Sequence, residues 1–157
     1  MKISDFVCTE AIVPELSSVD RDEVILELVE ALRKAKKIKK SESEEIYKAI
    51  IKRENEASTG IGKGVAVPHV KHSCVKNVIA AIGRTSRGID FSSLDKQPVY
   101  SVFLLISPPD KPDKHLEAME NLFKCLQNDD FRRFLKQAET AENIKDLICE
   151  ADESFAV

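Results

Sequence analysis

The chain has 157 residues, a formal net charge of −3 at pH 7, and 43% hydrophobic residues. A chain of this length can bury most of its apolar surface within one domain, and its composition excludes a disordered or fibrous protein. The acidic balance argues against general binding of nucleic acid, which requires a basic surface to neutralise phosphates. We therefore expect a single globular domain over residues 1–157 with no nucleic-acid partner.

The first residues lack the apolar core of a signal peptide. The longest aliphatic runs, such as residues 102–106, are far shorter than the roughly 20 residues that a membrane-spanning helix needs. We therefore expect a cytoplasmic protein with no membrane insertion. In a chain without a secretion signal, cysteines that form no Cys-x-x-Cys pair are expected to be free thiols: Cys8, Cys74, Cys125 and Cys149.

Apolar residues recur at helical spacing over residues 20–36, where Asp20 can cap the helix and Glu23 stands three positions later. A basic string follows at the C-terminal end of this helix: Lys34, Lys36, Lys37, Lys39 and Lys40. Cations there offset the helix dipole, and a phosphate- or membrane-binding patch is the alternative. Ser41 and Glu44 then show the pattern of a capping box, which predicts a second helix reaching about Glu54.

Three apolar segments with strand character come next, at residues 64–68, 78–83 and 99–107. The last segment is almost wholly apolar, as expected for a strand that is covered on both faces. Helical spacing returns over residues 113–127, and shorter helices are predicted over residues 131–137 and 141–149. Helices before and after the strands predict a layered α/β domain.

Residues 53–69 carry the most informative pattern. Three of the chain's 5 glycines, Gly60, Gly62 and Gly64, stand there at every second position. Backbone N–H groups of such a loop, which begins at Thr59, can point at an anion. The spacing is neither the Gly-x-Gly-x-x-Gly of a dinucleotide-binding fold nor that of a P-loop, so both of these phosphate-binding motifs are disfavoured.

A histidine follows this loop. Because Pro68 has no N–H to donate to a sheet, we expect the strand to end there and His69 to project from its end. A second histidine, His115, lies near the start of the third long helix. An imidazole with one nitrogen hydrogen-bonded and the other free can act as a nucleophile, and a guanidinium such as that of Arg53 can bind phosphoryl oxygens two at a time.

These residues resemble the phosphorylation-site signature of enzyme IIA in the fructose–mannitol family of the bacterial phosphotransferase system. The matching residues are Arg53-Glu54, then Ser58-Thr59-Gly60-Ile61-Gly62, then Gly64-Val65-Ala66-Val67-Pro68-His69. Further segments occur in the family's order, and the resemblance covers about residues 5–148: Gly88-Ile89-Asp90-Phe91, Asp95-x-Gln97-Pro98-Val99, the apolar strand to Ile106, and His115-Leu116. The chain departs from the family at Asn55-Glu56-Ala57, where a lysine and a glycine are common.

The resemblance implies a mixed β-sheet flanked by helices on both faces, and a phosphotransferase component that carries a phosphoryl group on histidine. His69 would accept the group, His115 and Arg53 would share its site, and backbone N–H groups of the Thr59–Gly64 loop would bind the phosphate. An HPr-like phosphocarrier would be the donor. The group would pass to a IIB domain, as in sugar transport, or serve as a signal, as in the nitrogen-regulatory branch that this chain resembles most. No nucleotide, metal or other cofactor is required.

Other interpretations of the same residues stay open. Arg53 could be a helix-end cation paired with a nearby glutamate, and such a pair would contribute little. His69, His72, Cys74 and His115 could ligate a metal, although the paired spacing of a structural zinc site is missing and a ligating His69 could not act as a nucleophile. A non-catalytic interaction module that retains the fold is the remaining alternative.

Overall fold

A computed structural model describes residues 1–154, so the last residues of the domain expected over 1–157 lie outside the described part. Its helices are α1 (Ile3–Phe6), α2 (Arg21–Lys34), α3 (Lys40–Glu56), α4 (Pro112–Leu126), α5 (Asp129–Gln137) and α6 (Ala141–Ser154). Its strands are β1 (Val7–Val13), β2 (Gly60–Gly62), β3 (Val65–Ala66), β4 (His69–Lys71), β5 (Ile79–Ile89) and β6 (Val99–Ser107). Within these residues, no helix combines the length and the apolar character required to span a bilayer.

The six strands form one sheet. Their spatial order is β1-β5-β6-β3-β2. β4 lies on the same side of β6 as β3 and pairs with a later part of that strand. β1 runs parallel to β5, and both β3 and β4 run parallel to β6. The pairs β5–β6 and β2–β3 are antiparallel. The sheet is therefore mixed, as the resemblance implied.

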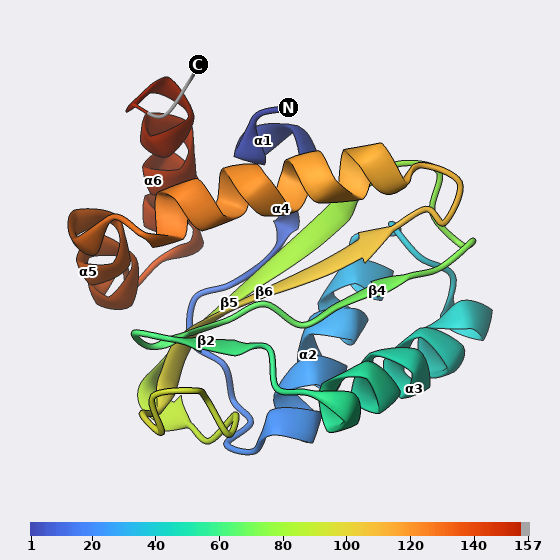
Figure 1. Cartoon of the computed structure of the whole chain (residues 1–157), viewed down its shortest axis with the longest axis horizontal. Coiled ribbons are helices and arrows are strands. Elements are labelled where there is room, and N and C mark those ends of the chain that lie inside the picture. Colours follow the sequence, from blue (N-terminus) through green and yellow to red (C-terminus); the bar gives the residue numbers. More distant parts are fainter. Residues whose placement is uncertain (155–157) are drawn as a thin grey trace.

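Helices cover both faces of this sheet (Figure 1). On one face, α1, α4, α5 and α6 pack over side chains that include Phe103 and Leu105 of β6. On the other face, α2 and α3 pack over side chains that include Leu104 and Ile106. Successive side chains of a strand point to opposite faces, which explains why β6 needs an unbroken apolar run. The α/β fold class with helices on both faces is confirmed.

Sequence patterns did not predict α1 or β1. The pairing of β1 with β5 shifts register between Val7 and Ile12, and the intervening Thr9 and Glu10 are exposed. This irregularity breaks the alternation by which a half-buried strand is recognised. β5 is also longer than predicted, since it continues to Ile89 instead of ending at residue 83.

The two helix starts behave differently. α2 begins as predicted, because the Asp20 carboxylate accepts a hydrogen bond from the Glu23 N–H at 3.0 Å. The predicted capping box at Ser41 is wrong: α3 already begins at Lys40, and the N–H of Lys39 donates to the Glu42 carboxylate at 3.3 Å. In both helices the hydrogen bond joins the cap residue to the residue three positions later. The shift in α3 arises because five acidic or hydroxyl residues, 41–45, follow one another here.

Candidate functional site

His69 lies where the line formed by β3 and β4 is interrupted. β3 ends at Ala66, and β4 begins at His69. The prediction that His69 follows the end of its strand is therefore wrong, because His69 is the first residue of a new strand. Both segments remain attached to β6, because the Pro68 carbonyl accepts from the Leu105 N–H at 3.0 Å. Because Pro68 has no N–H to donate, it interrupts the strand between β3 and β4, but it does not end the pairing of this segment with β6.

The register with β6 decides which way His69 points. His69 is the partner of Leu105, and Lys71 is the partner of Ser107. Leu105 belongs to the core beneath α4, and residues two apart on a strand share a face. His69, Lys71 and Ser107 therefore all lie on the face that α4 covers.

The first turn of α4 brings His115 to the same place. The ring centroids of His69 and His115 are 5.6 Å apart, and the ring planes are inclined by 45°. The two histidines are separated by 46 positions in sequence (115 − 69), so the fold itself brings them together. The expected convergence of the two rings is confirmed; the chemical role of each residue stays a prediction.

The His69 ring is anchored by its own strand. Nδ1 lies 2.8 Å from the Val67 carbonyl oxygen. A carbonyl oxygen only accepts hydrogen bonds, so Nδ1 carries the proton and Nε2 keeps a free lone pair. Burial lowers the pKa of His69, and the nearby charges of Arg53 and Lys71 lower this pKa further, against the raising effects of the Val67 hydrogen bond and of Glu54.

The His115 ring is hydrogen-bonded to the last residue of β6. Its Nδ1 lies 2.6 Å from the Ser107 hydroxyl oxygen. Burial lowers the pKa of His115, and the neighbouring His69 and Lys71 lower this pKa further. Both imidazoles are therefore neutral at pH 7. Nothing in the sequence pattern indicated Ser107, because a serine before two prolines reads as the start of a turn.

Arg53 lies near His69 but is hydrogen-bonded elsewhere. It lies in the last turn of α3, and its Nη1 donates to the Ala57 carbonyl at 2.9 Å. In this position it caps the end of its own helix, and within residues 1–154 its guanidinium makes no hydrogen bond to either histidine. Its charge is still near enough to lower the pKa of His69.

A buried carboxylate fixes the turn after α3. Glu54 is 2% exposed, and its two oxygens accept from the Thr59 N–H at 2.7 Å and from the Thr59 hydroxyl at 2.5 Å. The Thr59 carbonyl in turn accepts from the Val67 N–H at 3.0 Å, two residues before His69. The sequence places Glu54 at the end of the predicted helix and in the matching pair Arg53-Glu54, but nothing in its pattern indicates this burial or these contacts with Thr59.

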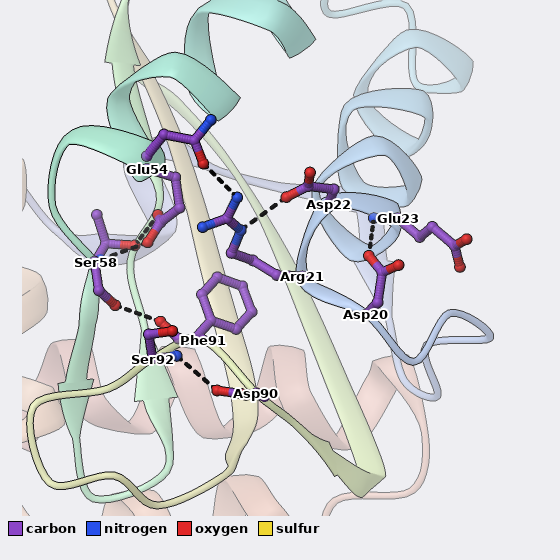
Figure 2. Close-up of polar contacts among 11 residues, drawn as sticks. Asp20, Arg21, Asp22, Glu23, Glu54, Ser58, Asp90, Phe91 and Ser92 are labelled. Atoms are coloured by element: carbon purple, nitrogen blue, oxygen red, sulfur yellow. Dashed lines mark hydrogen bonds and ion pairs between the residues drawn. The ribbon is translucent and has the colours of Figure 1, made fainter.

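Figure 2 shows how the same turn is tied to its surroundings. The Ser58 hydroxyl donates to the Phe91 carbonyl at 2.5 Å, which links the end of α3 to the loop after β5. Arg21, at the start of α2, donates to Asp22 and to the side chain of Asn55. The segment that leads to His69 is thus held by contacts with α2, α3 and the Phe91 loop.

The N–H groups of Thr59 and Gly60 at the start of the glycine loop already have partners, and the Gly64 end of the loop lies away from His69. The Thr59 N–H is taken by Glu54, and the Gly60 N–H donates to the Ser58 hydroxyl at 3.0 Å. Gly62 and Gly64 shape the β2–β3 hairpin, with φ angles of 95° and 81° that favour glycine. The Gly64 carbonyl accepts from the Ser101 N–H, four positions along β6 from the partner of His69, which is about 13 Å. That this loop binds the phosphate stays a prediction, and the contacts of Thr59 and Gly60 show which N–H groups would have to be released for it.

The residues considered for a metal site have other partners. His72 Nε2 lies 3.1 Å from Glu45, and His72 Nδ1 accepts from the Cys74 N–H at 3.0 Å. In the described part of the chain, no three His, Cys, Asp or Glu side chains are grouped so as to hold a metal ion. The lysine string lines an open groove of about 550 Å³ between the end of α2 and the start of α3, together with Arg33, Ile38, Glu42 and Cys74.

Comparison with known proteins identifies related sequences and folds. Residues 5–151 match the family model described as phosphoenolpyruvate-dependent sugar phosphotransferase system, EIIA 2. The chain is 36% identical to the fructose-specific EIIABC component of Bacillus subtilis (strain 168), over 97% of this chain but only 24% of that relative. It is similar to the crystal structure of nitrogen regulatory protein IIA-Ntr from Neisseria meningitidis, with a TM-score of 0.83, 26% identity, and coverage of 93% of this chain and 98% of that one. Enzyme IIAMTL in its complex with phosphorylated enzyme IIBMTL from Escherichia coli shares the fold, with a TM-score of 0.75, 17% identity, and coverage of 90% and 95%.

Proposed function

The chain belongs to the EIIA 2 family of the phosphoenolpyruvate-dependent sugar phosphotransferase system, and we propose that it carries a phosphoryl group on Nε2 of His69. The observation that carries this proposal is the pair of rings at 5.6 Å, in which His69 has its Nδ1 bound to the Val67 carbonyl and its Nε2 free. A phosphoryl group between two such rings can be bonded to one and hydrogen-bonded by the other.

The transfer step needs no reactant besides the phosphohistidine of the donor protein. The Nε2 lone pair of His69 attacks the phosphorus of a phosphohistidine on an HPr-like donor, while the donor's N–P bond breaks and its electron pair returns to the donor imidazole. The Nδ1 proton stays on His69, so the ring gains positive charge as the new N–P bond forms. The Val67 carbonyl stabilises that charge through a charge-assisted hydrogen bond. Positioning and charge stabilisation are what a protein supplies in such a reaction.

The lowered pKa values favour this chemistry. Only the neutral form of His69 has a lone pair on Nε2, and burial keeps that form populated at pH 7. The charge that assists this, Lys71, lies on the same face as His69 and can attract the negative phosphoryl oxygens. A nearby cation therefore lowers the pKa of the nucleophile and stabilises the product.

Arg53 is the second cation of the proposed site. It must leave the Ala57 carbonyl to reach phosphoryl oxygens, and a flexible side chain at a helix end can make that change. A partner that docks over α3 and α4 would bring negative charge to this point and favour the change. We therefore keep Arg53 and His115 with His69 as the site, and we do not assign Gly62 or Gly64 to it.

The relatives support a proposal for the partner and for the use of the phosphoryl group. The similarity to IIA-Ntr, with a TM-score of 0.83 and 26% identity, exceeds the similarity to IIAMTL, with a TM-score of 0.75 and 17% identity. We therefore propose a cytoplasmic phosphotransferase component of the nitrogen-regulatory type, whose phosphorylation state controls its binding to a target protein. Transfer to a IIB domain is the alternative, supported by the related IIAMTL–IIBMTL complex.

The test is phosphorylation of the purified chain by a phosphohistidine donor protein that phosphoenolpyruvate regenerates. Intact mass should increase by one phosphoryl group in the wild type and in His72→Ala, the matched control whose ring is bound to Glu45. His69→Ala should stay unmodified although it remains folded. Full modification of His69→Ala would show that another residue is the acceptor.

A further inference from the structure

Ser107 is the last residue of β6 and is fully buried at 0% exposure. Its hydroxyl oxygen lies 2.6 Å from His115 Nδ1, and among residues 1–154 this is the only hydrogen bond of its side chain. We infer that the Ser107 hydroxyl donates to His115 Nδ1 and thereby holds His115 in the tautomer that carries its proton on Nε2. Ser107 is then a positioning residue for phosphoryl transfer, and this role rests on the proposed function.

The direction of this hydrogen bond follows from what burial allows. If His115 Nδ1 donated to Ser107, the hydroxyl proton of Ser107 would be left without an acceptor in the protein interior. An unsatisfied buried donor costs free energy, and nearly all such groups in proteins have a partner. When the Ser107 hydroxyl donates to the lone pair of Nδ1, both groups are satisfied by one bond. His115 then carries its single proton on Nε2.

The two rings are thereby held in opposite tautomers. The Val67 carbonyl keeps the proton of His69 on Nδ1, so that Nε2 offers a lone pair. The Ser107 hydroxyl keeps the proton of His115 on Nε2, so that this nitrogen offers a donor. One ring is prepared to attack phosphorus and the other to donate to a phosphoryl oxygen. The opposite tautomer of His115 would present a lone pair to those oxygens, which repels them.

The tautomer matters because His115 is not protonated at neutral pH. Burial, His69 and Lys71 all act to keep the ring neutral, so it has one N–H to offer and not two. A histidinium would donate from either nitrogen, and no serine would be needed to choose between them. In the neutral ring, the position of the single proton decides which nitrogen can donate. Ser107, which is hydrogen-bonded to Nδ1, sets that position.

The first test is a measurement on the unmodified wild type. The 15N chemical shifts of the His115 ring at pH 7 distinguish a protonated Nε2 from a protonated Nδ1. We expect Nε2 to carry the proton. A ring that is protonated on Nδ1 would overturn the inference without any variant, and it would leave the proposed role of His69 intact.

The second test uses Ser107→Ala, with Ser107→Thr as the variant that retains the hydroxyl. Ser101→Ala is the matched control, because Ser101 is also a buried serine on the same strand and the same face. Single-turnover transfer from a phosphorylated donor should slow by about tenfold in Ser107→Ala, less than the roughly 100-fold that loss of a whole donor costs. The 15N shifts of His115 should show a mixture of tautomers in Ser107→Ala and one tautomer in Ser107→Thr and Ser101→Ala. Ser107→Thr and Ser101→Ala should also transfer at nearly the wild-type rate.

A double-mutant cycle separates positioning from a general loss of structure. If Ser107 acts only through His115, then Ser107→Ala should have no further effect on the transfer rate in a His115→Ala background. An equal loss of rate in both backgrounds would overturn the inference, as would unchanged shifts and rates in Ser107→Ala alone. Failure of the wild type to accept any phosphoryl group would instead refute the proposed function.

Discussion

The connection from Glu54 to His69 can be tested by changing one buried oxygen. Glu54 accepts two hydrogen bonds from Thr59, the Thr59 carbonyl accepts from Val67, and the Val67 carbonyl accepts from His69 Nδ1. Glu54→Gln keeps the size of the side chain but replaces one acceptor with an NH2 group. That group would face one of the two Thr59 donors, 2.5 to 2.7 Å away in the wild type.

The expected cost can be worked out from these contacts. A hydrogen bond to a charged group contributes about 1.5–3 kcal/mol, and a buried donor left without an acceptor costs about 1–3 kcal/mol. Partial rearrangement of the turn will recover some of this, so we expect Glu54→Gln to lower the free energy of unfolding by about 2–4 kcal/mol. Glu56→Gln is the control, because Glu56 is exposed on the same helix end, and it should change this free energy by less than about 0.5 kcal/mol.

The assay is urea unfolding at pH 7, with the midpoint and the slope fitted together. A lower midpoint at an unchanged slope means that stability has fallen without a change in the surface exposed on unfolding. The transfer rate should also fall in Glu54→Gln, because the strand that carries His69 loses its support. Equal stability and equal transfer rates in Glu54→Gln and Glu56→Gln would refute the claim that this connection positions His69.

Three further predictions follow from the charges and caps of the same structure. In stopped-flow measurements, Arg53→Ala should slow phosphoryl transfer by about 100- to 1000-fold, and the rate of Arg53→Lys should lie between those of the wild type and Arg53→Ala. A change within about twofold in Arg53→Ala would mean that Arg53 only caps its helix. Because the pKa of His69 is lowered, the transfer rate should persist below pH 6.5 and fall only on further acidification. Lys71→Glu should move the midpoint of this pH profile to higher pH, and an unchanged midpoint would exclude Lys71 from the site. Asp152→Asn should lower the free energy of unfolding by about 1–3 kcal/mol in urea, because this carboxylate accepts from the N–H groups of Ile3 and Ser4 at 2.7 and 3.0 Å; unchanged stability would contradict that account.

The fold was predictable where hydrophobic periodicity is clean. α2, α4 and the long apolar strand β6 were found because their buried faces repeat at the spacing of a helix or fill both faces of a sheet. β1 was missed because its register shift hides the alternation, and β4 because Pro68 reads as the end of a strand. A local pattern cannot show that the chain resumes the same pairing two residues after a break.

The site was predictable only in part. Residue type and position made His69, His115 and Arg53 candidates, but only the resemblance to a family put them in one site, since spacing along the chain does not reveal that residues 46 positions apart share one face. Glu54 and Ser107 were missed because both act through burial, which a single sequence does not display. The glycine pattern is conspicuous in the sequence, but it does not show that the φ angles of Gly62 and Gly64 shape a hairpin.

A phosphoryl group on Nε2 of His69 would be visible in a single NMR spectrum. The phosphorylated chain, labelled with 15N, can be recorded with 31P–15N correlation through the N–P bond. We expect one phosphorus signal coupled to Nε2 of His69, with Nδ1 still protonated and hydrogen-bonded to the Val67 carbonyl. Coupling to Nδ1 of His69, or to either nitrogen of His115, would contradict it.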